Sequence, residues 1–429
     1  MDTIFAVSSG APPAAIAVMR LSGPRAFAAA EMLAGSLPEP RRAGLRALRD
    51  PRDGELLDRA LLLCFPGPGT ATGEDIVELH LHGGRAVVRA VEAALAALPG
   101  MRAAEAGEFT RRALMHGRLD LSEAEGLGDL LMAETEGQRR VAVRSAEGAL
   151  RREVEGWIDR LLVLSARVEA ALDHGDEDDV ASADPLADVQ GQALLLAEAI
   201  AEMVSRPPAE RLRDGLRIVL AGPTNAGKST LFNALVERDA AIVSSIAGTT
   251  RDRIEAPVVR DGIAYVLIDT AGLAEGTEDP IEQIGMGRSL EAMQAADIVL
   301  WLGDDPPPPE LPQVLWIGAR ADAVGRQALS GRDLAVSAVD GTGLATLWKR
   351  IGEIAIDLLP PPDLVALNRR QRALCERARD ALMRASLQSD PIFFAEELRG
   401  ARAALDAITG GAGTEDVLDA LFGRFCIGK

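Results

Sequence analysis

The sequence predicts a multidomain α/β plus α protein: an N-terminal α/β domain, followed by a helical domain that a second α/β domain interrupts. Short apolar runs bounded by Gly and Pro, typical of strands, occur up to about residue 118 and again over 214–360. Leu, Val and Ala at three- and four-residue spacings, typical of amphipathic helices, fill the segments between and after these regions. A length of 429 residues fits about three domains.

Composition narrows the class of protein. Hydrophobic residues make up 48% of the chain, enough for several cores, but aromatic residues only 3%, so Leu, Ala, Val and Ile must build those cores. No apolar run reaches transmembrane length, and the sequence from Met1 lacks a secretory leader pattern, so we expect a cytoplasmic protein without a membrane partner. A net charge of −19 argues against a surface that binds nucleic acid throughout, although a local basic patch remains compatible with it.

The N-terminal α/β region extends to about residue 118. Strands are expected at 14–21, 60–65 and 75–81, and an amphipathic helix at 85–98. His80 and His82 alternate along the last strand and therefore share a face. A polar pair satisfied by its neighbours is favoured there over a pair of metal ligands.

Helical patterns flank the second α/β region on both sides. They cover 121–172 and 186–204 before it, and 364–408 and 415–425 after it. The acidic run 173–179 favours an exposed loop between helices over a cation site. We therefore expect the two helical halves to pack together around an inserted domain.

A phosphate-binding loop opens the inserted domain. The apolar run 216–221 reads as a strand, and it leads directly into Gly-Pro-Thr-Asn-Ala-Gly-Lys-Ser at 222–229. Its glycines let backbone N–H groups surround phosphate oxygens, while Lys228 can reach the terminal phosphates and the Ser229 hydroxyl can bind Mg²⁺. Arginine fills most cationic positions of this chain, so the retained Lys228 fits a requirement for a compact ammonium group.

Two further motifs follow in the order of a GTPase switch. Gly-Thr-Thr-Arg-Asp occupies 248–252, where Thr250 can donate its hydroxyl oxygen to Mg²⁺. Asp-Thr-Ala-Gly occupies 269–272, where Asp269 ends an apolar strand and can meet the Mg²⁺ shell. With strands also expected at 298–302, 314–318 and 334–337, the region predicts a doubly wound parallel sheet in a Ras-like P-loop GTPase domain.

The motif that would read guanine departs from the usual Asn-Lys-x-Asp. It falls on Ala319-Arg320-Ala321-Asp322. Asp322 can accept the guanine N1 and N2 hydrogens and Arg320 can stack on the base, but Ala319 cannot make the amide contacts of Asn. Ser337 and Ala338 fit the last base-contacting loop. GTP remains the expected nucleotide, with weakened affinity or selectivity.

The residue that positions the attacking water must also differ from the usual one. Leu273 follows the Asp-Thr-Ala-Gly motif, where small signalling GTPases commonly carry Gln. Glu282, in the same region, is the candidate, and an exposed surface carboxylate is the alternative.

Beyond these motifs, the chain resembles the MnmE (TrmE) family of tRNA-modification GTPases over essentially its full length. The motifs that carry the resemblance, besides the inserted GTPase domain, are Val-Met-Arg-Leu-Ser-Gly at 18–23, Thr-Gly-Glu-Asp at 72–75, His-Gly-Gly at 82–84, Gly-Glu-Phe-Thr at 107–110, Gly-Arg-Leu-Asp-Leu at 117–121 and Cys-Ile-Gly-Lys at 426–429. The resemblance implies a tetrahydrofolate-binding and dimerisation domain at 1–118, helical halves at 119–212 and 361–429, and a GTPase domain at 213–360.

The resemblance also implies activity and partners. The family works as a homodimer with a flavin-dependent partner, MnmG, in a heterotetramer that binds tRNA jointly. Together they add a carboxymethylaminomethyl or aminomethyl group at carbon 5 of the wobble uridine, using 5-formyl- or methylene-tetrahydrofolate. The folate-binding positions that correspond here are Arg20, Glu78, Arg118 and Lys429.

Nucleotide-site roles follow from the same resemblance. Family members are activated by K⁺, whose ligand positions match Asn225, Ser244, Ile246 and Thr249, and Glu282 aligns with the acid that positions water. The nucleotide-binding residues expected are Asn225, Ala226, Gly227, Lys228, Ser229, Thr230, Ser244, Ser245, Ile246, Ala247, Gly248, Thr249, Thr250, Asp269, Thr270, Ala271, Gly272, Arg320, Asp322, Ser337 and Ala338.

Two alternatives stay open at this stage. Cys426 is important for modification in the family, but a purely structural buried thiol is the competing interpretation. For the whole chain, the competing function is a regulatory GTPase switch of the ribosome-assembly type that lacks modification activity. Folate binding, together with loss of wobble-uridine modification on deletion, would separate the two.

Overall fold

The computed structural model describes residues 2–173, 187–239, 255–270, 290–311, 313–323, 331–410, 418, 421–423, 425, 427 and 428. The chain divides into two compact units. The first unit comprises Met1–Gly128, Ala146–Glu155 and Leu405–Lys429, and the second comprises Asp129–Ser145 and Gly156–Ala404. No helix among the described residues is both long enough and apolar enough to span a membrane.

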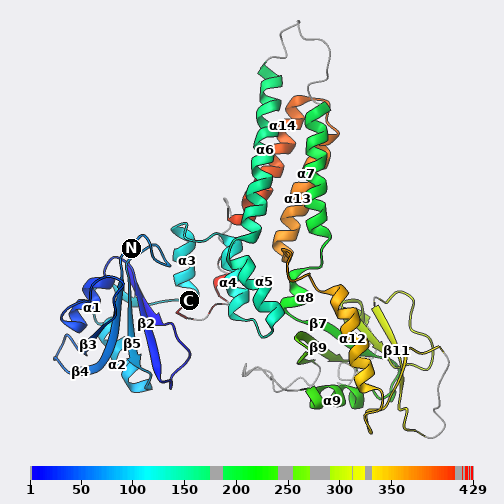
Figure 1. Ribbon diagram of the computed structural model, residues 1–429, viewed down its shortest axis with the longest axis horizontal. Coiled ribbons are helices and arrows are strands. Elements are labelled where there is room, and N and C mark those ends of the chain that lie inside the picture. The colour runs from blue at the N-terminus through cyan, green and yellow to red at the C-terminus, as the bar shows by residue number, and fades with distance from the viewer. Residues whose placement is uncertain are drawn as a thin grey trace, which may run out of the picture. The chain divides into compact units, whose positions relative to one another are not determined.

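A six-stranded sheet forms the centre of the first unit (Figure 1). Its strand order is β3-β4-β5-β2-β1-β6, and all neighbouring pairs are antiparallel except β1 and β6. The strands are β1 Thr3–Val7, β2 Ile16–Ser22, β3 Gly44–Arg49, β4 Leu56–Phe65, β5 Ile76–His82 and β6 Met101–Ala103. The sequence predicted β2, β4 and β5 but not the other three.

The two faces of this sheet have different environments. On one face, Met19, Leu21 and Leu79 are fully buried in a core to which α1 (Ala26–Ala34) and α2 (Arg85–Ala96) contribute. On the other face, α3 (Glu108–Met115) covers only the β1 side, where Phe109 packs with Ile4 and Ala6.

The remainder of that second face is open. The pairing register places Val18, His80, Leu61 and Leu45 in one row across β2, β5, β4 and β3. Leu45 is 61% exposed and Leu61 is 45% exposed. One face of an antiparallel sheet commonly faces solvent, but solvent-facing positions are then usually polar. The exposed leucines of this face therefore need an explanation in the function.

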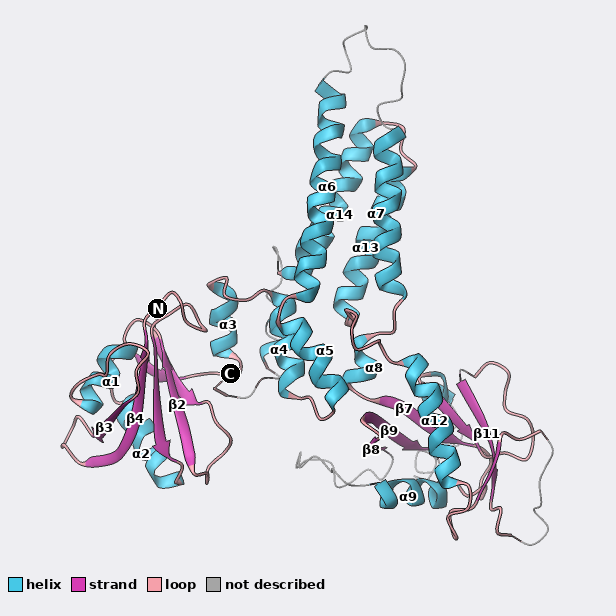
Figure 2. Ribbon diagram, in the orientation of Figure 1, coloured by secondary structure: helices cyan, strands magenta, loops and turns pink. Residues whose placement is uncertain are grey.

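Helices from both sides of the inserted domain pack against each other in the second unit, as the sequence predicted (Figure 2). Gln190 of α7 donates from Nε2 to the carbonyl of Gln388, at 2.6 Å, just beyond the end of α13. The described helices outside the two sheet domains are α4 Leu121–Leu131, α5 Glu136–Ala146, α6 Ala149–Asp173, α7 Ala187–Ser205, α8 Ala209–Arg213, α13 Arg369–Ser386 and α14 Pro391–Thr409. The acidic run from residue 174 onward, and most of the helix expected at 415–425, lie outside the described residues.

The inserted domain also contains a six-stranded sheet, in the order β12-β11-β10-β7-β9-β8. Its strands are β7 Leu216–Ala221, β8 Glu255–Arg260, β9 Ile263–Asp269, β10 Ile298–Trp301, β11 Gln313–Ala319 and β12 Leu334–Val336. The five strands expected from the sequence pair in parallel, and β8, which was not predicted, pairs antiparallel with β9 at the edge. Pro257 lacks a backbone N–H donor, and an edge strand tolerates that lack.

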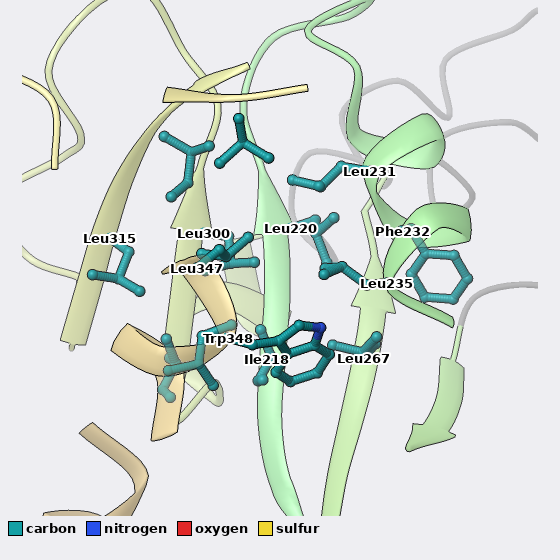
Figure 3. Close-up of a cluster of buried hydrophobic side chains, with 14 of the residues drawn as sticks. Ile218, Leu220, Leu231, Phe232, Leu235, Leu267, Leu300, Leu315, Leu347 and Trp348 are labelled. Atoms are coloured by element: carbon teal, nitrogen blue, oxygen red, sulfur yellow. The ribbon is translucent and has the colours of Figure 1, made fainter. Parts of the chain in front are cut away.

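Two helices cover one face of this sheet and build its main core (Figure 3). They are α9 (Lys228–Asp239) and α12 (Leu344–Leu358). Leu235 and Leu347 are fully buried against strand residues such as Ile218. Because β7, β10, β11 and β12 run parallel, the loops that follow them lie together at the carboxyl ends of the strands.

Candidate functional site

The loop after β7 has the geometry of a phosphate cradle. Gly222 and Gly227 adopt φ values of 140° and 100°, which non-glycine residues rarely adopt. A Cβ at Gly222 would lie 3.1 Å from the backbone nitrogen of Gly303, so the loop packs closely against the backbone that follows β10. Such a loop directs backbone N–H groups inward, and the start of α9 adds a favourable dipole for an anion.

Lys228 is held inside this loop. Its Nζ donates to the carbonyl oxygens of Gly222 and Pro223, both at 2.9 Å, and the residue is only 7% exposed. Burial lowers the pKa of the Lys228 ammonium, and the charge of Asp269 partly opposes this shift. A phosphate oxygen would supply the negative charge that the buried ammonium group requires.

Oxygen donors suited to a hard cation lie beside the cradle. Asp269 ends β9, is 5% exposed and pairs in register with Leu220 of β7. Thr270 donates its hydroxyl to the Leu220 carbonyl at 2.8 Å, which fixes the chain directly after Asp269. Ser229 stands exposed in the first turn of α9. A carboxylate and a hydroxyl are the ligand types that Mg²⁺ takes beside substrate phosphates.

The loop after β11 contacts the cradle directly. Arg320 donates from Nη2 to the carbonyl of Asn225. Both residues have positive φ, 60° for Arg320 and 62° for Asn225, although neither is glycine. Positive φ at non-glycine residues is uncommon and marks positions that their surroundings hold in place. The Arg320 guanidinium, which we expected to stack on a base, therefore also holds the phosphate loop through a hydrogen bond.

Several predicted site residues lie outside the described part of the chain. They are Ser244, Ser245, Ile246, Ala247, Gly248, Thr249, Thr250, Ala271, Gly272, Glu282, Cys426 and Lys429. The K⁺ loop, the water-positioning acid and the thiol therefore stay predictions.

The structure brings two of the predicted folate residues together. Arg20 of β2 and Glu78 of β5 face each other in the register, with Arg20 Nη2 at 2.8 Å and Nε at 3.1 Å from Glu78 Oε1. The second oxygen of Glu78, Oε2, lies 3.5 Å from Nε2 of His80. The Phe109 ring, 5.9 Å from the Arg20 guanidinium carbon, borders the pair. Together these residues form a half-buried polar spot on the open face of the sheet.

The two histidines of β5 each lie near a carboxylate. His80 faces Glu78, and His82 Nδ1 lies 2.7 Å from Oδ1 of Asp58. Each imidazole has its own carboxylate neighbour, which fits a polar pair that its surroundings satisfy.

Arg118 contacts a loop near the Arg20–Glu78 pair. Its Nε donates to the carbonyl of Thr70 at 3.0 Å. The loop that starts at Thr70 reaches Ser22, two residues after Arg20, because the Ser22 and Thr72 hydroxyls are 2.7 Å apart. Arg118 is therefore linked, through the loop at 70–72, to the end of β2 that carries Arg20.

A buried ionic cluster near this loop was missed by the sequence analysis. Arg112 is 8% exposed, and its Nη1 lies 3.1 Å from both carboxylate oxygens of Glu74 while its Nη2 lies 3.0 Å from Glu108. Burial alone would raise the pKa of Glu108, but hydrogen bonds from Arg102 and Arg112 lower it overall. Glu74 and Glu108 stand inside the motifs at 72–75 and 107–110, and those motifs were the only available sign of the cluster.

The end of the chain packs onto the same unit. Ile427 forms an antiparallel bridge with Ala106, and the Ser8 hydroxyl donates to the carbonyl of Gly428 at 2.8 Å. A Cβ at Gly107 would lie 2.8 Å from Cβ of Phe422. Ile427 also lines a cavity of about 680 Å³ between the end of β1 and α2. The residues on both sides of position 426 are thus held by the N-terminal sheet domain.

These features define a P-loop nucleotide-binding protein with a Ras-like sheet inserted into a helical region, joined to a separate antiparallel sheet domain. The profile of the GTP-binding protein TrmE N-terminus matches residues 3–118, and that of the MnmE helical domain matches residues 121–426. The chain belongs to the MnmE family of tRNA modification GTPases.

Relatives of similar length support this assignment. Proteins named tRNA modification GTPase MnmE from Rhizorhabdus wittichii and Erythrobacter litoralis are 59% and 56% identical to it. Both matches cover 100% of this chain, and 97% and 100% of the respective relatives. The G domain of the T. maritima FeoB iron transporter is 26% identical over 33% of this chain and 98% of its own, with a TM-score of 0.24. At that score the structural likeness adds nothing to the assignment.

Proposed function

We propose that this protein hydrolyses GTP and, with a flavin-dependent partner (MnmG), adds an aminomethyl-type group to carbon 5 of the wobble uridine of tRNA. The one-carbon unit comes from 5-formyl- or methylene-tetrahydrofolate. The observation that carries this proposal is the full-length match, at 59% identity, to a protein named tRNA modification GTPase MnmE. A regulatory switch would need the phosphate cradle but not the polar Arg20–Glu78 spot on the other unit.

The cradle residues have distinct roles in hydrolysis. The Nζ of Lys228 donates to two loop carbonyl oxygens at 2.9 Å. When GTP binds, Lys228 exchanges these hydrogen bonds for bonds to the terminal phosphates. Mg²⁺ would be held by Ser229 and Thr250, and K⁺ by Asn225, Ser244, Ile246 and Thr249. When bound, these ions would neutralise charge on the phosphoryl oxygens. Glu282 positions the attacking water, since Leu273 cannot.

The Arg20–Glu78 spot supports folate binding. Glu78 Oε2 can accept from the donor-rich edge of a pterin ring, and the Phe109 ring provides an apolar wall beside it. Arg118 and Lys429 would contact the anionic glutamate tail. The exposed Leu45 and Leu61 on the same open face support coverage by a second copy of the chain, as in a homodimer.

Calorimetry of the full-length protein with 5-formyl-tetrahydrofolate tests the folate assignment. Arg20→Ala leaves Glu78 without its ion pair and should weaken binding at least tenfold. Arg42→Ala is the matched control, because Arg42 lies in the same unit and its side chain is 79% exposed. Equal folate affinities for the two variants, or no binding by the wild type, would contradict the assignment.

The role of Cys426 is tested separately. We expect Cys426→Ser to retain GTP hydrolysis and to lose wobble-uridine modification in a complementation assay. Cys375→Ser serves as the control for a purely structural thiol, because Cys375 is fully buried in α13. Normal modification by Cys426→Ser would show that its thiol is structural.

A further inference from the structure

The two loops expected to contact the nucleotide base carry an unusual set of hydrogen-bonding groups. These loops follow β11 and β12, at residues 319–323 and 337–342. They are joined to each other, since the backbone N–H of Ala321 donates to the Val336 carbonyl at 3.1 Å. They are joined to the phosphate cradle by the bond from Arg320 to Asn225. A base next to the cradle must therefore be read by these loops.

Ala319 provides only a methyl group at the start of this surface. The residue ends β11, is 7% exposed and faces the cradle, because a Cβ added to Gly227 would lie 4.0 Å from the Cβ of Ala319. A side-chain amide at this position could reach both the cradle and a base. A methyl group can donate no hydrogen bond to either.

Two other side chains of these loops make contacts within the protein. Arg320 donates to Asn225. The Ser337 hydroxyl is fully buried and accepts from the N–H groups of Val339 and Asp340 at 3.2 and 3.3 Å. Hydrogen bonds from Thr342 contribute most to the lowered pKa of Asp340. Ser337 therefore shapes its own turn rather than contacting a base.

Asp322 is an exposed carboxylate of the loop after β11. A carboxylate accepts two N–H groups at once, and the N1 and N2 groups of guanine supply such a pair on one edge of the ring. The opposite edge of guanine carries the N7 and O6 acceptors, which need donors. The backbone N–H of Ala338 could serve O6, but the methyl group at position 319 cannot serve N7.

We infer that this protein reads guanine from its Watson–Crick edge alone, through Asp322, and leaves N7 unread because position 319 is Ala. The Arg320–Asn225 bond substitutes for the link to the cradle that an amide at position 319 would make. This inference rests on the proposed use of GTP and specifies how the base is selected. It predicts tolerance of changes at N7 together with strict dependence on the N2 amino group.

Competition against fluorescently labelled GDP tests the inference, with GDP, 7-deaza-GDP, IDP and ADP as competitors. The wild type should bind 7-deaza-GDP within about twofold of GDP, because no hydrogen bond is lost. IDP, which lacks the N2 amino group, should bind about tenfold or more weakly, since a bond to a charged carboxylate is lost. Ala319→Asn should favour GDP over 7-deaza-GDP by about fivefold, the effect of one neutral hydrogen bond.

The outcomes separate the inference from the proposed function. A wild-type preference of fivefold or more for GDP over 7-deaza-GDP overturns the inference while leaving GTP as the substrate. Equal binding of ADP and GDP overturns guanine selection altogether. The wild-type ratio decides the question even if Ala319→Asn does not fold.

Discussion

Gly428→Ala should release the end of the chain from the N-terminal sheet domain. Gly428 has a φ of 98°, and a Cβ there would lie 2.1 Å from the carbonyl oxygen of Val7 and 2.8 Å from its carbonyl carbon. Both atoms are backbone, so no rotamer change relieves the clash. The segment must move by roughly 1 Å, which breaks the 2.8 Å bond from the Ser8 hydroxyl to Gly428.

The cost of that movement follows from its parts. Positive φ costs Ala about 1–2 kcal/mol, and the lost hydrogen bond costs about 1 kcal/mol. A total of about 2–3 kcal/mol reduces the equilibrium constant for docking by roughly 30- to 150-fold. Gly54→Ala is the matched control, because Gly54 has a φ of 79° in the same unit but nothing within 4 Å of its added Cβ.

Hydrogen exchange of the peptide 421–429 measures the docking, and a complementation assay measures modification. For Gly428→Ala we expect faster exchange in that peptide and reduced wobble-uridine modification, with GTP turnover unchanged. Gly54→Ala should change none of the three. Unaltered exchange in Gly428→Ala would refute the docking argument, and unaltered modification despite faster exchange would refute its functional meaning.

Three further predictions concern charged groups. Lys228→Met should lower GTP turnover by about 10²- to 10³-fold in a phosphate-release assay, whereas Lys349→Met, on the exposed side of α12, should not. Arg112→Ala leaves the buried Glu74 carboxylate without its guanidinium partner and leaves Glu108 with Arg102 alone, so the free energy of unfolding in urea should fall by about 3–5 kcal/mol. A loss below about 1 kcal/mol, as for an exposed pair, would contradict the buried network. The pKa of Glu108 is lowered from 4.5, so its stabilisation is complete above pH 4.5 and is lost as the pH falls below it; the urea midpoint of Glu108→Gln should therefore depend less on pH between 5 and 3 than that of the wild type.

The nucleotide-binding sheet was largely predictable because each of its parallel strands is a short apolar run. Such runs at 217–221, 265–269 and 298–302 correspond to β7, β9 and β10. The edge strands were harder to recognise. Pro257 in β8 and the arginines of β3 break the strand pattern, and only the pairing with a neighbouring strand stabilises them.

Site residues that depend on local sequence were predictable, whereas contacts between distant residues were not. Lys228 and Asp269 were predictable because their roles depend on local sequence spacing. The contact from Arg320 to Asn225 joins residues 95 positions apart, and the Arg112–Glu74 pair joins residues 38 apart. Contacts of this kind arise from how strands and helices pack, and residue types alone do not reveal the partner.

The most direct test of the account is steady-state phosphate release by the full-length protein from GTP and from ATP, in K⁺ buffer and in Na⁺ buffer. The account predicts rapid GTP hydrolysis in K⁺, slower hydrolysis in Na⁺, and loss of this difference in Asn225→Ala with GTP binding retained. It also predicts that ATP is hydrolysed at least about 100-fold more slowly, because Asp322 repels an adenine N1 acceptor. Equal turnover of GTP and ATP, or equal GTP turnover in the two buffers, would contradict it.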